Sequence, residues 1–546
     1  MKLTNFFRSS CLVLVAAATL THAESSITED SPTAPLLEGI GPLSFPISTS
    51  VPGTQAYFNQ ALTLAFGFNH AEAVRSFKEA ARLDPTCGIC YWGVALALGP
   101  NINAPMPPEA VAPAWQAVQD ALARREFENA KEKAYIDTIV ARYSEKGEDR
   151  ATLDLLYVGA LSGLVDTYPD DLHARTLHAE ALMDLMPWEY WTDDGKPANH
   201  HTVTLVSELE TVLAQNPKHP GANHLYIHTM ERFEPHKAEA AADLLGPLVP
   251  VAGHLVHMPS HIYLRVGRYA DAVDANAKAS MADEDYIAQC NAQGLYPAAY
   301  YPHNIHFLWY SAMMEGRKGL ALESAMKLRE RVPVEVAKSM GALQSYLSVP
   351  IYTYVRFGMW NDILALSAPP PGLPFTSAMH LYGQGLAYAA LGNSKAAGVA
   401  LAELDAMADS DLLKNLNMRR PGATADLLGI ARNLVAARLA RSSGDVTAEV
   451  SFLKQAVEHQ DNLPYTEPPL WHYPVRQTLG DTQLRMGAYE DASETFKADL
   501  THFPANPWSL FGLEKAVSAS GGNPGDLSTR RAHAWRNADI APAVSW

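Results

Sequence analysis

Histidine pairs are the most distinctive feature of the stretch from residue 219 to residue 306. His224 and His228 are four residues apart, and His257 and His261 repeat that spacing. On a helix, side chains at i and i+4 project from the same face, so each pair predicts a patch of two imidazoles. The second pair follows the first by 33 residues (224 to 257). If helices at that interval stack, four imidazoles meet in one place.

Imidazole is a common ligand of transition metals, and a pair at i and i+4 can chelate from one helical face. Glu231 adds a carboxylate three residues after His228, which gives a two-histidine, one-carboxylate set suited to iron, manganese or zinc. A third histidine pair would raise the number of imidazoles to six, enough for a dinuclear copper-type centre. We therefore expect copper, iron or zinc, held by His224, His228, His257, His261, His303, His306 and Glu231, with Glu180 as a further ligand or base.

Other interpretations of these histidines remain open. A histidine patch also serves as a polar ligand site or as a set of structural hydrogen bonds. The chain has no H-E-x-x-H motif, which disfavours an ordinary zinc protease, and no phosphate loop or nucleophile elbow. His254 is expected to be a secondary or surface residue.

The elements that must position these side chains are predicted to be helices. Ala73, Phe77, Ala80 and Pro85 have the spacing of a helix that packs closely against a neighbour and stops at the proline. Similar punctuation recurs down the chain, for example at Gly267-Arg268-Tyr269 and at Gly487-Ala488-Tyr489. No alternation typical of a β-strand persists, so an all-α fold is predicted.

These repeats resemble the tetratricopeptide superfamily, and a group of secreted or periplasmic members in particular. The phrases that carry the resemblance include F-G-F-N-H-A-E-A-V-R-S-F, H-P-G-A-N-H-L-Y-I-H, H-M-P-S-H-I-Y-L-R-V-G-R-Y and P-P-L-W-H-Y-P-V-R, within residues 54 to 520. The resemblance implies a right-handed superhelical solenoid of antiparallel helix pairs with irregular insertions. It also implies that the histidines lie along a concave groove. Pro259 departs from the pattern, because it falls inside the helix expected to carry His257 and His261.

The N-terminus indicates export. A short basic segment, an apolar run and the ending T-H-A before Glu24 predict a signal peptide over residues 1–23, hence a secreted or periplasmic protein. Residues 24–50 are expected to form a flexible leader, followed by repeat arrays at 51–330 and 331–530 and a tail at 531–546. Cys87 and Cys90 could close a small disulfide in an oxidising compartment. No later apolar run is long enough for a membrane span.

Two classes of function follow from these patterns. The formal charge of −17 argues against nucleic-acid binding. The first class is a scaffold whose groove binds a protein, a peptide or a small molecule, with a metal site among the histidines. The second is a metal-dependent enzyme, an oxidoreductase or hydrolase, whose metal is held by histidine pairs on successive repeats.

Overall fold

The computed structural model confirms the all-α prediction. It describes residues 32–146, 149–290, 296–408, 410–414, 416 and 422–545, and within these residues there are helices, turns and two isolated bridges but no strand. The predicted signal peptide, residues 1–23, lies outside the described residues, as does the beginning of the predicted leader.

The α-helices of the first part of the chain are α1 (Thr54–Phe66), α2 (His70–Leu83), α3 (Gly88–Ala97), α4 (Val111–Arg124), α5 (Ala130–Arg142), α6 (Arg150–Thr167), α7 (Leu172–Asp184), α8 (His200–Gln215), α9 (Pro220–Met230), α10 (Glu239–Leu248), α11 (Gly253–His257), α12 (Pro259–Arg265), α13 (Tyr269–Cys290) and α14 (Tyr301–Glu315). The helices that follow are α15 (Lys318–Arg331), α16 (Val334–Ser339), α17 (Gln344–Arg356), α18 (Trp360–Ala365), α19 (Pro374–Ala390), α20 (Ser394–Ala408), α21 (Asp411–Lys414), α22 (Ala423–Ser443), α23 (Val446–Asp461), α24 (Arg476–Arg485), α25 (Tyr489–His502), α26 (Pro507–Ala519) and α27 (Leu527–Ala534). A short π-helix, η4, covers Tyr296–Tyr300.

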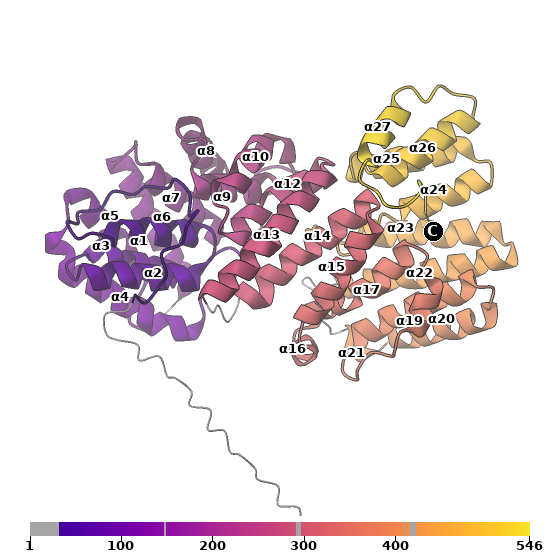
Figure 1. Ribbon diagram of the computed structural model, residues 1–546, viewed down its shortest axis with the longest axis horizontal. Helices are drawn as coiled ribbons and strands as arrows, with labels where there is room; N and C mark the ends of the chain where they lie inside the picture. Colours follow the sequence, from indigo (N-terminus) through magenta and orange to yellow (C-terminus); the bar gives the residue numbers. More distant parts are fainter. Residues whose placement is uncertain are drawn as a thin grey trace, which may run out of the picture.

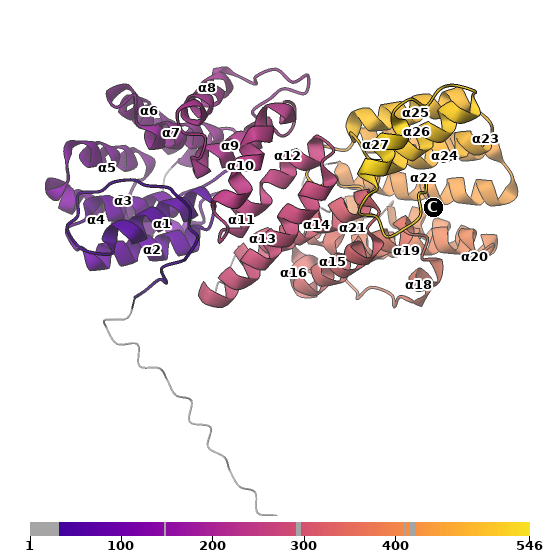
Figure 2. The same ribbon diagram turned by 45° about the horizontal axis from the view of Figure 1, so that its top comes forward.

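Neighbouring helices pack against each other in sequence and build an elongated array (Figure 1). The pairs α1–α2, α13–α14, α19–α20 and α22–α23 are among those in close contact. Helices α1 to α8 occupy one end, α19 to α27 the other, and α13 and α14 lie between them (Figure 2). The arrangement is a solenoid of helix pairs, as predicted.

Glycines that face aromatic rings let successive helices approach closely. A Cβ atom at Gly93 in α3 would lie 2.3 Å from the ring of Phe77 in α2, so only glycine fits against that ring. Near the other end of the chain, Gly480 and Gly512 face Phe496 in the same way, at 2.4 and 2.3 Å. This recurring contact is the physical basis of the repeat signature in the sequence.

Residues 32–50 differ from the predicted flexible leader. Phe45 is buried, with its ring 5.3 Å from that of Phe58 and 5.1 Å from that of Tyr135. The backbone N–H of Leu37 donates a hydrogen bond of 2.7 Å to Gln60 Oε1. This segment has no regular structure, but its few apolar side chains cover the first helices and hold it in place.

The apolar core continues across the predicted boundary at residue 330. One cluster of buried apolar residues extends from Leu37 to Leu479, and a smaller one links Ala492 with Val544. The predicted tail is docked as well, since Trp535 lies 5.2 Å from Trp508 and Asp539 accepts hydrogen bonds from the backbone of Lys318 and Gly319. Among the described residues, no helix has the length and apolar character needed to cross a membrane.

Candidate metal centre

Helix α9 carries the first histidine pair through the interior of the array. All 11 of its residues are buried, and it contacts α1, α7, α8, α10 and α12. A helix surrounded in this way directs every side chain into protein. The prediction that these histidines line an open concave groove is therefore wrong for His224 and His228. The exposed fractions of their side chains are 0% and 3%.

The first histidine triad consists of His224 and His228 from α9 and His254 from α11. One nitrogen from each ring lies within 4.8 Å of the others. His224 Nδ1 lies 2.6 Å from the carbonyl oxygen of Phe66, which can only accept, so Nδ1 carries the proton and Nε2 keeps its lone pair. That Nε2 atom faces His254 Nε2 at 3.2 Å.

His228 is the member of this triad with the least protein support. Neither of its ring nitrogens has a hydrogen-bond partner among the described residues. Its Nδ1 atom lies 3.9 Å from Glu231 Oε1, which is too long for a hydrogen bond. A buried polar group without a partner is costly and calls for an explanation, and an unmodelled ion is one of the usual ones.

The second histidine triad consists of His257 from α11, His261 from α12 and His303 from α14. His257 Nδ1 lies 2.6 Å from Asn276 Oδ1, and the amide of Asn276 is oriented because its Nδ2 donates to the carbonyl of Ala272. His257 therefore donates from Nδ1, and its Nε2 atom faces His261 Nε2 at 3.0 Å. The ring of His303, which is only half-buried, lies 4.9 Å from that of His257.

Pro259 explains how the second triad forms. It stands at the first position of α12, directly after α11 ends at His257, so the chain restarts its helix between His257 and His261. The departure from the repeat pattern does not separate this pair. It divides the histidines so that His254 joins the first triad, while His257 and His261 converge on α14.

The distances within the triads fit ligands of one ion. Two nitrogens bound at about 2.0–2.1 Å, with angles between 90° and 110°, lie about 2.9–3.4 Å apart. The separations of 3.2 Å in the first triad and 3.0 Å in the second fall in that range. Metal-binding histidines usually donate their other N–H to a carbonyl or carboxylate, as His224 and His257 do here.

The two triads are neighbours. The rings of His228 and His261 are 5.6 Å apart, and those of His254 and His257 are 5.9 Å apart. Because each ring of one triad is close to a ring of the other, two ions bound here would share one buried chamber. All six histidines except His303 are buried.

Two carboxylates flank His261. Its Nδ1 atom lies 2.6 Å from Glu231 Oε2 and 3.2 Å from Glu467 Oε2. Burial opposes the charged ring, but Glu231 and Glu467 outweigh it and raise the pKa of His261 to about 10. Burial also opposes the Glu231 anion, and His261 and His228 nevertheless lower its pKa to about 2. Glu231 is thus a carboxylate that orients His261, an arrangement common behind metal-bound imidazoles.

The other rings of the two triads favour the neutral form. Burial lowers the pKa values of His224, His254 and His257 well below the usual value, and neighbouring imidazoles lower them further. Burial lowers the pKa of His228 as well. Neutral imidazole is the form that binds a metal, so these rings need no deprotonation before binding at neutral pH.

Two predicted ligands lie elsewhere. His306 packs on the rings of Trp309 and Tyr346, with centroids 5.2 and 4.9 Å away, and belongs to no group of converging ligand atoms. Glu180 lies on α7, where burial raises its pKa to about 7 and the charge of Arg142 opposes that rise. The structure therefore brings together His224, His228, His257, His261, His303 and Glu231 but neither His306 nor Glu180.

Sequence reasoning missed two members of the site. His254 lies three residues before His257, a spacing that also shares a helical face, but the even i and i+4 pairs drew attention away from it. Glu467 comes from the loop between α23 and α24, and only the tertiary fold brings it to Glu231 and His261. No local spacing in the sequence predicts that contact.

Comparison with known families agrees with this architecture. The family model for the tetratricopeptide repeat matches residues 54–87, which cover α1, α2 and the turn that follows. The chain is a tetratricopeptide-repeat protein. No curated protein resembles this tetratricopeptide-repeat chain closely enough to count as a match.

Several solved structures are similar to this tetratricopeptide-repeat protein over most of its length. The human IFIT1 dimer with m7Gppp-AAAA is 13% identical, with 90% of this chain and 92% of that chain covered and a TM-score of 0.30. The tetratricopeptide domain of P58(IPK) is 12% identical, with coverage of 80% and 98% and a TM-score of 0.24. Such low scores support no conclusion about ligands or activity.

Proposed function

We propose that the protein is an exported tetratricopeptide scaffold that binds two transition-metal ions, one at each histidine triad. The observation that carries the proposal is the convergence of the ring nitrogens. In each triad, a protein acceptor holds one Nδ1 proton, and the Nε2 atom of that ring faces another Nε2 atom at 3.0–3.2 Å. The unpartnered nitrogens of His228 add to it.

The donor set limits the identity of the ions. Three imidazole nitrogens suit copper, zinc or iron and are poor ligands for magnesium or calcium. Glu231 would support His261 from behind, and Glu467 would add a second carboxylate at the same ring. Export rests on the predicted signal peptide and is supported by the disulfide between Cys87 and Cys90, a bond that persists in oxidising compartments.

Metal analysis of untagged protein tests the proposal. After loading with Zn²⁺ or Cu²⁺ and removal of excess metal, we expect about two ions per chain by mass spectrometry of the elements. His228→Gln should remove the ion of the first triad. His306→Gln is the matched control, because this histidine lies in α14 outside both triads, and it should leave the metal content unchanged. Absence of bound metal in the loaded wild-type protein would refute the proposal.

A metal-dependent enzyme, an oxidoreductase or hydrolase, is the second candidate function. It is favoured by the number of ligands, because three protein nitrogens per ion leave coordination positions open for water or substrate. Oxygen uptake by the copper-loaded protein with a reductant, and ester hydrolysis by the zinc-loaded protein, would test it. Both activities should disappear in His228→Gln and persist in His306→Gln. Without either activity, the scaffold function remains, with a protein, a peptide or a small molecule as its partner.

A further inference from the structure

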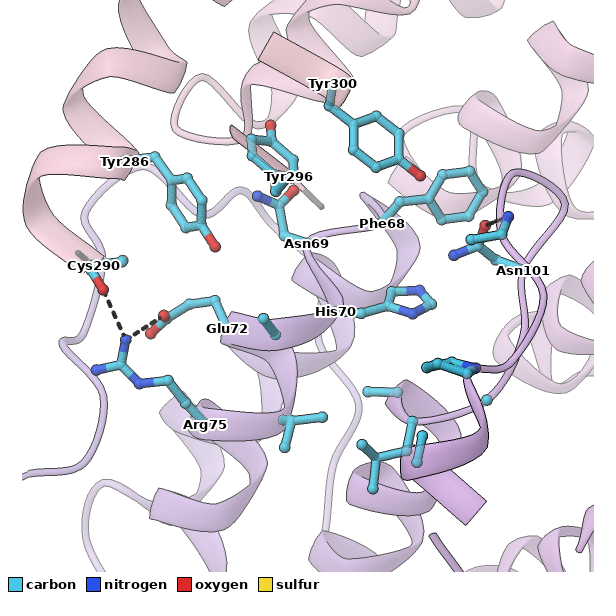
Figure 3. Close-up of a pocket in the computed structure, with 18 of the residues that line it drawn as sticks. Phe68, Asn69, His70, Glu72, Arg75, Asn101, Tyr286, Cys290, Tyr296 and Tyr300 are labelled. Atoms are coloured by element: carbon cyan, nitrogen blue, oxygen red, sulfur yellow. Dashed lines mark hydrogen bonds and ion pairs between the residues drawn. The ribbon is translucent and has the colours of Figure 1, made fainter. Parts of the chain in front are cut away.

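A pocket of about 580 Å³ lies beside the first histidine triad (Figure 3). It is enclosed by the start of α2, the segment after α3, the end of α13 and the π-helix η4. Its size is within the range of small-molecule sites in proteins. The pocket is formed by segments that lie far apart in the sequence, from Phe68 to Tyr300.

Aromatic rings form much of the wall. Tyr286, Tyr296 and Tyr300 project from one side and Phe68 lies below Tyr300 (Figure 3). The rings of Tyr286 and Tyr296 are 5.1 Å apart, and those of Tyr296 and Tyr300 are 5.3 Å apart and nearly parallel. A wall of this kind favours a flat ring, which stacks or meets ring edges at such distances.

The charged groups of the wall are already compensated. Glu72 Oε2 and Arg75 form an ion pair of 2.9 Å, and Arg75 also donates to the backbone oxygens of Cys290 and Thr33. His70 is neutral at pH 7, because burial lowers its pKa to about 4. A charged ligand would have no free counter-ion here, so the wall favours an uncharged one.

Polar groups at one end provide hydrogen bonds. Asn101 Oδ1 accepts from the backbone N–H groups of Asn103 and Ala104, which turns its NH₂ group away from them (Figure 3). The Tyr300 hydroxyl accepts a hydrogen bond of 3.4 Å from Asn103 Nδ2 and keeps its own proton to donate. A hydroxyl or carbonyl group on the ligand would accept from both donors.

Phe68 connects this pocket with the first histidine triad. Its ring centroid lies 4.6 Å from that of His224, 5.5 Å from that of His254 and 6.3 Å from that of His228. Phe68 has a φ angle of 57°, in the left-handed region that bulky residues rarely adopt. Such backbone strain persists only where the surroundings enforce it, and it concentrates at functional sites.

We propose that this pocket binds a small uncharged aromatic molecule with a hydroxyl or carbonyl substituent, with its ring against Phe68. The inference deepens the proposed function, because it gives the class of ligand that the first metal ion would meet. Tyr300 takes part from the other side, since its ring lies 4.9 Å from that of His254. The ligand and the ion would thus touch the same two rings.

Binding of 2-naphthol to the metal-free protein, measured by calorimetry, tests the pocket alone. We expect saturable binding of one molecule per chain and much weaker binding of 2-naphthoate, which is an anion. Ala71→Trp should weaken 2-naphthol binding about tenfold or more, because Ala71 lines the pocket and its side chain is exposed, so a tryptophan fills the pocket without disturbing the core. Ala151→Trp is the matched control, since Ala151 is also exposed and also the second residue of its helix. Equal binding by the two variants, or none by the wild type, would overturn the proposal.

The link to the metal needs a second arm with Co²⁺ as the probe. If Co²⁺ loads the triads, its visible spectrum should shift when 2-naphthol is added to the wild type but not to Ala71→Trp. Binding of 2-naphthol to a protein that takes up no Co²⁺ would refute the proposed function and leave the pocket standing. A Co²⁺ spectrum in a protein that binds no 2-naphthol would do the reverse. Binding of both without a spectral shift would overturn the contact through Phe68.

Discussion

Two buried polar centres of this molecule are built in opposite ways. Around Asp499 in α25, one carboxylate oxygen accepts hydrogen bonds from Ser509 Oγ at 2.5 Å, Asn506 Nδ2 at 3.0 Å and Gln477 Nε2 at 3.4 Å. Three donors thus surround one acceptor. In the histidine triads, by contrast, rings that favour the neutral form face one another, and the nitrogens of His228 have no hydrogen-bond partner among the described residues.

The difference separates a structural network from a receiving site. Interior polar groups normally satisfy one another, and those around Asp499 do so through the oxygen Oδ2. The triads contain more lone pairs than protons to share, which is what a positive ion requires and what a structural network avoids. The predictions that follow alter one centre at a time.

Asp499→Ala should have the largest effect on stability. Its removal leaves the donors of Gln477, Asn506 and Ser509 buried without their shared acceptor. We expect the free energy of unfolding to fall by about 3 kcal/mol, measured by urea titration, with no change in metal content. A loss of bound metal in this variant would show that the two centres are not independent.

Metal should stabilise the protein through the triads. Binding to the folded state alone contributes about 2.7 kcal/mol at a free metal concentration one hundred times the Kd. Thermal unfolding with and without Zn²⁺ should show a raised Tm for the wild type and for His306→Gln. The double variant His228→Gln, His261→Gln should show no such rise. An equal rise in the double variant would place the bound metal elsewhere.

Asn276→Ala should weaken the second triad and spare the first. Without Oδ1 of Asn276, His257 loses the acceptor that fixes its tautomer and orientation. Loss of such an outer partner typically reduces metal affinity about 10–100-fold. Competition with a chromophoric chelator should therefore resolve one weakened ion and one unchanged ion. If both ions weaken together, the triads act as a single site.

A small pH effect is expected from Asp283. Burial raises the pKa of this carboxyl from 3.8 to about 7, and it accepts hydrogen bonds of 2.7 Å from Tyr296 and Asn304. Because the folded state holds the proton more tightly, the stability that Asp283 provides is complete below pH 4 and decreases as the pH rises towards 7. Asp283→Asn should remove that slope, which amounts to about 1 kcal/mol per pH unit at most. Chemical unfolding between pH 4 and pH 8 measures it, and parallel slopes for the two proteins would contradict the assignment.

The helical framework was predictable because its signals are local. The spacing of Phe77 and Pro85 and the i and i+4 histidine pairs depend on a few neighbouring residues. Residues 32–50 docked against expectation, because irregular segments carry no periodic signal. Burial of α9 was missed, since it depends on five helices from elsewhere in the chain. Glu467 reaches His261 for the same reason, through tertiary contacts that no spacing reveals.

X-ray absorption of the zinc-loaded protein tests the central claim most directly. With two ions bound per chain, we predict three imidazole nitrogens for each zinc at about 2.0–2.1 Å, together with the outer-ring scattering that identifies histidine. A shell made only of oxygen ligands, or a single imidazole per zinc, would contradict the account and indicate adventitious binding at the surface.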